Sequence, residues 1–328
     1  FCGHRQAEGL QPACVEQCPT GALGFGPMDE LSPIEEGVGL PTLAPGPAIR
    51  FVPWRRSVVE TGGTPQNGAT AETDQATRKI SLRKEWPLVA FTWIAALLVA
   101  AFVADAAGSP WFELSPWAFF SLAALGMGAS TAHLGKPLRA WRALLNWRHS
   151  WLSREIALFS AFAGLATLDF LMPTTPWLAP AAGFCGLAAL YAIDRVYDLV
   201  RPPEARLLHS ADVVLTGALL TALLLGKPWA TGAVALIELV LYLWRKVLRR
   251  QRGKTVRWAW SAARLGLGFA VPLGLALTGA QHWTAWALVS VLLGELIDRC
   301  EFYEELEVPT PRGQMDHELA ARLQRPAA

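Results

Sequence analysis

The stretch Trp86–Ala106, WPLVAFTWIAALLVAAFVADA, decides the fold of this 328-residue chain. Its single ionisable residue is Asp105, and it has the length of roughly 20 residues that an apolar helix needs to span the hydrocarbon core of a bilayer. Seven more apolar runs follow, and together they predict a mainly α-helical bundle of eight transmembrane helices. The predicted spans lie near Trp86–Ala106, Leu114–Leu134, Glu155–Met172, Trp177–Leu199, Ala211–Gly226, Trp229–Trp244, Trp258–Gly279 and Trp283–Arg299.

The composition agrees with a membrane protein. Hydrophobic residues make up 52% of the chain and charged residues 17%, whereas an ordinary soluble domain carries about 25% charged residues. Tryptophans mark the ends of predicted spans, where their amphipathic rings favour the interface between lipid and water: Trp86, Trp111, Trp177, Trp229, Trp258 and Trp283. We therefore expect a multi-pass protein of the inner or plasma membrane, with lipid as a partner and no nucleic-acid partner.

Three cysteines stand at the start of the chain, one at Cys2 and two in the run Cys14-Val15-Glu16-Gln17-Cys18-Pro19. A C-x3-C-P element ends the bacterial ligand run whose thiolates hold 4Fe-4S clusters, and its last cysteine usually serves the neighbouring cluster. The full pattern needs one more cysteine before Phe1, so the sequence reads as a piece of a longer protein. We expect Cys2 and Cys14 to belong to one incomplete cluster set and Cys18 to the neighbouring cluster.

Two other uses of these cysteines stay open. Structural zinc requires four closed ligands, commonly from paired knuckles, and no second knuckle follows in the sequence. A disulfide requires an oxidising compartment, which three cysteines so close together fit poorly. Cys185 and Cys300 stand alone in or beside apolar stretches, and we expect both to behave as small buried hydrophobic residues.

The chain divides into four parts by composition. Residues 1–56 are predicted to be the C-terminal remnant of a 4Fe-4S ferredoxin-like domain with an extended arm. Residues 57–85 belong to a Pro- and Gly-rich region. They are predicted to form a flexible linker, because proline and glycine disfavour long helices. The eight-helix anchor occupies 86–304, and a polar C-terminal tail follows at 305–328.

An even number of spans predicts that the chain enters and leaves the bundle on one side, which we call face A. Face A loops contain many basic residues: Lys136, Arg139, Arg142, Arg148, Arg154, Arg195, Arg201, Arg206, Arg245, Lys246, Arg249, Arg250, Arg252, Lys254 and Arg257. The opposite loops contain only Lys227. The positive-inside rule therefore places face A, with the cysteine segment, in the cytoplasm, unless some of this charge binds a partner subunit.

Ionisable residues in the spans gather on the face A side, where they suggest quinol chemistry. Oxidation of a quinol releases two protons and two electrons, so it needs proton acceptors at the bilayer boundary and a one-electron acceptor nearby. His133 titrates near neutral pH and, with Glu155, is the predicted pair of proton acceptors. Arg139 has a fork of donors that suits a quinone carbonyl. The alternative for His133 is a residue that caps a helix end against solvent.

Arg264 and Glu238 lie deeper, about six and seven residues below face A, or roughly 9–10 Å. Charges at this depth are costly unless they pair or serve a function. Two interpretations stay open: an internal ion pair that joins two neighbouring spans, or a role for Arg264 in a quinol pocket.

The whole chain resembles the electron-transfer and membrane-anchor subunits of the dimethyl sulfoxide reductase family of molybdoenzymes, fused in one polypeptide. The resemblance rests on residues 2–5, 12–19 and 22–31 for the iron-sulfur subunit, and on Glu85-Trp86-Pro87-Leu88, His133-Leu134-Gly135-Lys136-Pro137-Leu138-Arg139-Ala140 and Ser150-Trp151-Leu152-Ser153-Arg154-Glu155-Ile156 for the anchor.

The resemblance implies an eight-span anchor without haem that oxidises menaquinol at a site including His133 and Glu155. Electrons would pass through 4Fe-4S clusters to a molybdopterin catalytic subunit that reduces a sulfoxide or N-oxide in anaerobic respiration. The first three ligand groups of the iron-sulfur subunit are absent from this sequence, and no family arginine aligns with Arg264. Relatives with exported catalytic subunits place the cluster side outside the cytoplasm, so the orientation of face A stays open.

Three alternatives remain. A related polysulfide or tetrathionate-type oxidoreductase would use the same anchor to exchange electrons with quinone, including in the opposite direction. A transporter would show inverted repeats with broken spans in matching positions, and Pro272 in the seventh span has no counterpart in the third. A cytochrome would need paired axial histidines, for which His133 and His209 lie on one face.

Overall fold

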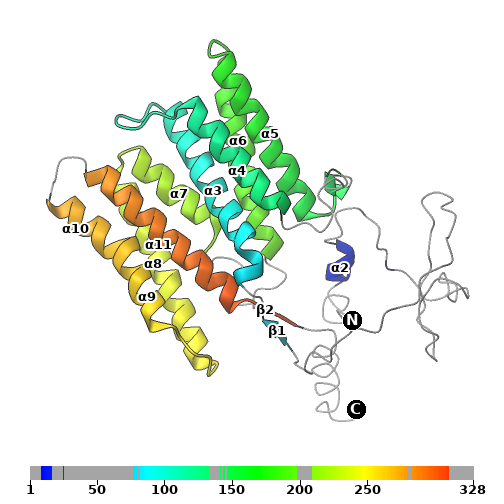
Figure 1. Ribbon diagram of the computed structural model, residues 1–328, viewed down its shortest axis with the longest axis vertical. Coiled ribbons are helices and arrows are strands. Elements are labelled where there is room, and N and C mark those ends of the chain that lie inside the picture. The colour runs from blue at the N-terminus through cyan, green and yellow to red at the C-terminus, as the bar shows by residue number, and fades with distance from the viewer. Residues whose placement is uncertain are drawn as a thin grey trace, which may run out of the picture.

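The computed structural model describes residues 9–16, 25, 77–79, 82–132, 141, 143–144, 146–197, 209–278 and 283–309. Helices dominate this part of the chain, so the predicted mainly α-helical class is confirmed (Figure 1). The long helices follow the predicted spans closely. The elements are α2 Ala13–Glu16, β1 Thr77–Lys79, α3 Leu82–Ala106, α4 Pro116–Ala132, α5 Trp151–Leu171, α6 Leu178–Tyr197, α7 Val213–Leu224, α8 Pro228–Gln251, α9 Trp258–Leu265, the π-helical turn η4 Gly266–Ala270, α10 Val271–Thr278, α11 Trp283–Glu305 and β2 Glu307–Pro309.

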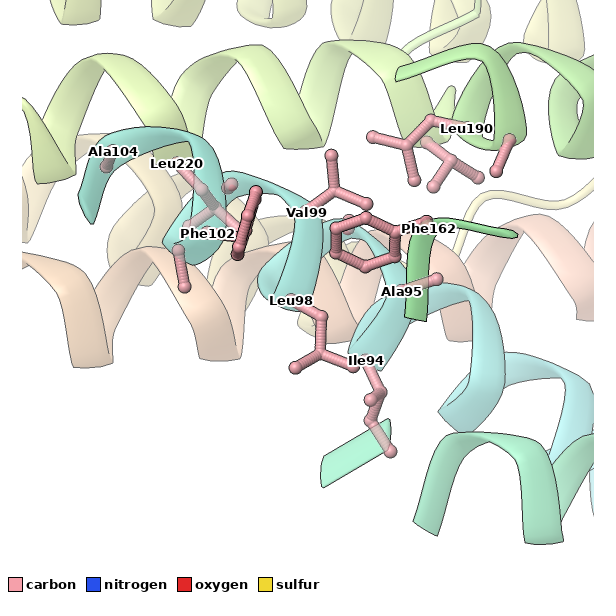
Figure 2. Close-up of a cluster of buried hydrophobic side chains, with 14 of the residues drawn as sticks. Ile94, Ala95, Leu98, Val99, Phe102, Ala104, Phe162, Leu190 and Leu220 are labelled. Carbon is pink, nitrogen blue, oxygen red and sulfur yellow. The ribbon is translucent and has the colours of Figure 1, made fainter. Parts of the chain in front are cut away.

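Helix α3, which contains the first predicted span, lies at the centre of the hydrophobic core. Ala95, Leu98 and Phe102 are at most 2% exposed, and Figure 2 shows their side chains among those of neighbouring helices. The Phe102 ring lies 5.7 Å from the ring of Phe162 in α5 in an edge-to-face arrangement. Alanines along α3 allow other backbones to approach closely. Burial of this helix against α4, α6, α7 and α11 therefore organises the bundle.

The outer surface of the bundle is apolar. Trp117, Trp229 and Leu277 are between 77% and 80% exposed. Buried charged side chains, in contrast, lie between the helices, as with Glu238 and Arg264 at 0% exposure. Soluble proteins show the opposite distribution, and large exposed apolar areas mark surfaces that contact lipid or protein.

Two helical stretches in the described residues are long and apolar enough to cross a membrane, by length and composition alone: Glu85–Ala106 and Trp258–Thr278. The first is the buried central helix, whereas only 17% of the second is buried. The count of eight transmembrane spans therefore stays a prediction, although helices occupy the predicted positions.

The two ends of the helical bundle meet. Strand β1 pairs antiparallel with β2, with Thr77 opposite Pro309 and Lys79 opposite Glu307. The start of α3 and the end of α11 are thus held on one side of the bundle, and the entry and exit of the polypeptide on one membrane face stay a prediction. The pairing itself was not predicted, because each strand has only three residues and lies in the predicted linker or tail.

Helix α8 runs well beyond its predicted end at Trp244, to Gln251. Arg245 and Lys246, which we had assigned to a face A loop, lie on this helix and form ion pairs with α11, for example Arg245 with Asp298 at 2.6 Å and Lys246 with Glu301 at 2.9 Å. The loop assignment was wrong for these two residues and for Arg249 and Arg250, because α8 continues to Gln251 and carboxylates of α11 neutralise Arg245 and Lys246 within the bundle. Basic residues that are paired internally say less about membrane orientation than free loop charges do.

Pro272 explains the π-helical turn between α9 and α10. The N–H of Val271 bonds the carbonyl of Gly266, five residues earlier. Pro272 has no N–H, so the carbonyl of Leu267 lacks a donor within its own helix. Ser290 of α11 donates to this carbonyl through its hydroxyl at 2.6 Å. The carbonyl group that the break leaves without a helical donor thus receives a hydrogen bond from the neighbouring helix, as apolar surroundings require.

Two glycines lie where helix α11 crosses the π-helical turn η4. A Cβ atom on Gly294 of α11 would lie 2.6 Å from the Cα atom of Gly268 in η4. Only hydrogen fits at this distance, so the two backbones can touch. Close approach of this kind is common between helices packed in membranes.

The replacement Gly294→Ala should lower the stability of the bundle by about 1–3 kcal/mol, because the added methyl group overlaps the backbone of η4. Gly274→Ala in α10 is the matched control, since nothing lies within 4 Å of its added Cβ. Alanine is the better helix former there, so the control should be neutral or slightly stabilising. Thermal unfolding of both variants in detergent measures the difference, and equal transition temperatures would show that the crossing is looser than described.

Candidate functional site

The structure describes part of the predicted site. Cys2, Cys18, His133 and Arg139 lie outside the described residues. Cys14 lies on α2, but its side chain is not described. Glu155 and Arg264 are described in full, and they lie in two different polar clusters. The predicted pairing of His133 with Glu155 therefore stays a prediction.

Glu155 lies directly after the first turn of α5. The helix begins after Ser150, whose hydroxyl accepts a hydrogen bond from the N–H of Ser153 at 3.3 Å, a typical N-cap. This start turns Glu155 toward the bundle interior, where it is 8% exposed. A carboxyl group is therefore held almost buried at the face A end of the helix.

Residues of α6 and α11 surround the Glu155 carboxyl group. It interacts electrostatically with Asp194 and with the hydroxyls of Tyr197 and Tyr303, which hydrogen-bond each other. Asp194 already accepts from the N–H groups of Val213 and Val214, at 2.7 and 3.0 Å, and so joins α6 to the start of α7.

Trp151 lies one turn before Glu155 and carries cations on its ring. The guanidinium carbons of Arg154 and Arg195 lie 4.3 and 5.6 Å from the ring centroid. Arg154 also donates to the backbone carbonyls of Trp147 and Arg148, at 3.1 and 2.5 Å. These contacts hold the loop before α5 in place beside the helix end.

A cavity of about 590 Å³ lies between this loop and the cysteine segment. Its size falls within the ~300–1,000 Å³ that is usual for small-molecule sites. Its lining comes from both segments: Gly9, Leu10, Gln11, Val15, Glu16, Asn146, Arg148, His149, Trp151 and Arg154. Helix α2, which carries Cys14, therefore faces the start of the helix that carries Glu155, as Figure 1 also shows.

Sequence reasoning did not single out the cavity residues His149 and Trp151. Trp151 had a usable signal, because it precedes the predicted site residue Glu155 by one helical turn. No sequence signal indicated that residues of Gly9–Glu16 would line the same cavity, since the contact joins segments more than a hundred residues apart in sequence.

The second polar cluster is centred on Arg264. Its guanidinium is 0% exposed and pairs with Glu238 of α8 at 3.1 Å and with Glu295 of α11 at 2.6 Å. Its Nε lies 3.6 Å from Asp298. The predicted Glu238–Arg264 ion pair is confirmed. The guanidinium is thus occupied by carboxylates, and the alternative role of Arg264 in quinol binding stays a prediction.

Ion pairs continue from this cluster along α8 and α11. Arg245 contacts Asp298 and Glu301, and Lys246 contacts Glu301 and Glu305 at 2.9 and 2.8 Å. Tyr242 donates to Glu301 at 2.7 Å. The sequence carried a signal for this arrangement that we did not use, because acidic residues spaced three or four apart lie on one side of a helix.

Comparisons with known proteins agree with this architecture. Residues 81–197 match the family model described as DMSO reductase anchor subunit (DmsC). The chain is 30% identical to the anaerobic dimethyl sulfoxide reductase protein YnfH of Escherichia coli K12 over 165 residues, which are 43% of this chain and 57% of that protein. It is 48% identical over 50 residues to a second anaerobic dimethyl sulfoxide reductase polypeptide of the same organism, 15% of this chain and 23% of that one.

A short match concerns a different enzyme. Over 31 residues, 10% of each protein, the chain is 68% identical to a sulfite dehydrogenase subunit of Allochromatium vinosum. The chain spans less than two thirds of the length of each of these relatives. No solved structure matches the chain.

Removal of the central cation should destabilise the bundle strongly. Arg264→Ala leaves Glu238 and Glu295 buried beside each other without a guanidinium, which should cost about 3–5 kcal/mol. Arg257→Ala is the control, because Arg257 is 56% exposed and its pair with Glu304 lies at the surface, where such pairs are worth about 0–1 kcal/mol. Thermal unfolding of both variants compares them, and an equally small loss would mean that the Arg264 cluster is hydrated and weak.

Proposed function

We propose that this chain, whose residues 81–197 belong to the family of DMSO reductase anchor subunits, anchors an anaerobic respiratory molybdoenzyme in the membrane and oxidises menaquinol. The family membership supports a membrane anchor of an oxidoreductase complex. The substrate, the multi-pass topology and the partner subunit are parts of the proposal. Its location is the inner or plasma membrane.

One observation carries the proposal: the cavity between α2 and the start of α5. A site that oxidises quinol needs a proton acceptor at the bilayer boundary and a one-electron acceptor close to the same pocket. Glu155 is almost buried and directly follows Arg154, which lines the cavity, whereas the segment with Cys14 lines the other side. An apolar quinol ring can pack against Trp151, which is one of the lining residues.

The chemistry assigns a role to each predicted residue. Glu155 and His133 accept the two protons that leave the quinol hydroxyls, as general bases. Arg139 holds the oxygen that becomes a quinone carbonyl, through its fork of donors. The arginines on Trp151 keep the pocket loop in place during the reaction.

Cys2, Cys14 and Cys18 would hold parts of two 4Fe-4S clusters. The donor set fits, because thiolates are the usual ligands of such clusters and Val15 and Glu16, next to Cys14, line the cavity. Among the described residues no three potential ligand side chains converge on one point, and the other two cysteines lie outside that part. When bound, a cluster of this type takes up one electron at a time.

The partner proposed for the complex is a molybdopterin catalytic subunit that reduces a sulfoxide or N-oxide. Similarity to two different dimethyl sulfoxide reductase polypeptides of Escherichia coli supports the fusion of an electron-transfer segment with an anchor. A second candidate is favoured by the match to a sulfite dehydrogenase subunit. In that case, electrons would leave a sulfur compound and reduce the quinone at the same pocket.

Glu155→Gln, and separately His133→Ala, should lower menaquinol-dependent reduction by the intact complex by about 100-fold or more, because each removes a general base. Reduction driven by a redox dye, which bypasses the quinol pocket, should be unchanged. Asp169→Asn is the matched control, since Asp169 lies on the same helix at its opposite end.

Equal loss in the quinol and dye assays would contradict the quinol site and indicate damage to the whole complex. The direction of electron flow is tested with the unmodified complex. Faster quinone reduction by sulfite than sulfoxide reduction by menaquinol would favour the second candidate.

A further inference from the structure

Four carboxyl groups form a line along one side of α11. Glu295, Asp298, Glu301 and Glu305 are spaced three or four residues apart, so they lie above one another over about 15 Å of helix. Glu295, Asp298 and Glu301 are at most 2% exposed. The side chain of Glu305, nearest to the end of the helix at face A, is 17% exposed. We call these four residues the acidic ladder.

Basic side chains connect each carboxyl group of the ladder to the next. Arg264 lies between Glu295 and Asp298, at 2.6 and 3.6 Å. Arg245 lies between Asp298 and Glu301, at 2.6 and 3.4 Å. Lys246 joins Glu301 to Glu305, at 2.9 and 2.8 Å. Polar contacts therefore run without a gap from the bundle interior to its face A end.

A network that served only to hold helices together would use all its buried acceptors, because an unsatisfied buried oxygen is costly. Three carboxyl oxygens do not follow this rule. Oε1 of Glu238, Oδ2 of Asp298 and Oε1 of Glu301 are buried and have no hydrogen-bond partner among the described residues. The oxygens of Glu238 and Glu301 can each accept a proton or a hydrogen bond from a water molecule, whereas Oδ2 of Asp298 faces Nε of Arg264 at 3.6 Å.

The two ends of the ladder lead to different places. At the outer end, Glu301 and Glu305 line a recess with Arg249, which opens beside the start of α9. At the inner end, Thr216 donates to Glu295 at 2.8 Å and accepts from Arg299 at 3.2 Å. Arg299 interacts electrostatically with Tyr197 and Tyr303, the two hydroxyls beside Glu155.

We infer that the acidic ladder is a proton pathway that connects the Glu155 site with a separate opening on face A. The inference rests on the proposed quinol chemistry, because that reaction delivers protons to Glu155. The proposed quinol cavity lies between the cysteine segment and the start of α5, whereas the ladder opens near the end of α8. A proton can thus leave while the quinol pocket is filled.

The test uses Glu301→Gln in the intact complex, with menaquinol as the electron donor. Glu301 faces Tyr242, Arg245 and Lys246. Glutamine has the same size as glutamate, but its amide group cannot take up and release a proton as a carboxyl group does. Menaquinol-dependent turnover should fall about tenfold or more, with dye-driven turnover unchanged. Formate, a small weak acid that carries protons, should restore much of the rate, and so should Glu301→Asp.

Asp169→Asn is the control, because Asp169 lies on α5 and belongs neither to the ladder nor to the lining of the recess at its outer end. Its turnover should stay unchanged. Unchanged turnover in Glu301→Gln would overturn the pathway, as would a loss that neither formate nor aspartate restores, since a structural ion pair predicts that result. If the Glu301 variant does not assemble, Glu305→Gln at the more exposed end carries the same expectations and the same contradicting outcomes.

The two variants distinguish a failure of the pathway from a failure of the Glu155 assignment. If Glu155→Gln retains quinol oxidation while Glu301→Gln loses it and formate restores it, the proposed connection between the ladder and Glu155 is overturned. If Glu155→Gln fails and Glu301→Gln behaves as the control, the quinol site stands and the pathway does not.

Discussion

The ion cluster around Arg264 is the constraint on which the second half of the bundle depends. Its guanidinium and the carboxylates of Glu238 and Glu295 are fully buried. An apolar helix interface offers no hydrogen bonds to such groups, so they must face one another. Helices α8, α9 and α11 therefore turn their charged sides inward and their apolar sides outward. The exposed tryptophans and leucines of these helices follow from the same requirement.

Close packing of the three helices requires local breaks in regular structure. Gly268 and Gly294 let two backbones touch, and the π-helical turn before Pro272 leaves a carbonyl that Ser290 satisfies. The first half of the bundle, around α3, uses alanine and phenylalanine packing instead. The halves are joined where Trp93 of α3 donates to the carbonyl of Leu292 in α11 at 3.0 Å, and where Thr216 bonds Glu295.

The sequence predicted the helices well because each apolar run is long and has clear ends. It also predicted the Glu238–Arg264 pair, since two opposite charges at similar depth in neighbouring spans are expected to form an ion pair. It did not predict the end of α8, because Arg245 and Lys246 resemble loop residues unless their partners on α11 are known. The β1–β2 pairing and the cavity beside Trp151 were not predicted for a similar reason, because both join segments that are distant in sequence. Cys2, Cys18, His133 and Arg139 lie outside the described residues, so this part of the site rests on the sequence.

The central claim is that quinol binds between the cysteine segment and the start of α5, at the cavity beside Glu155. Photo-crosslinking of the intact complex with a menaquinone analogue that carries a photoreactive group on its ring tests this claim most directly. The account predicts labelled peptides from residues 9–16 and 133–155, with labelling suppressed by excess menaquinol. Specific labelling confined to the opposite face of the bundle, or to the recess near Arg249, would contradict it.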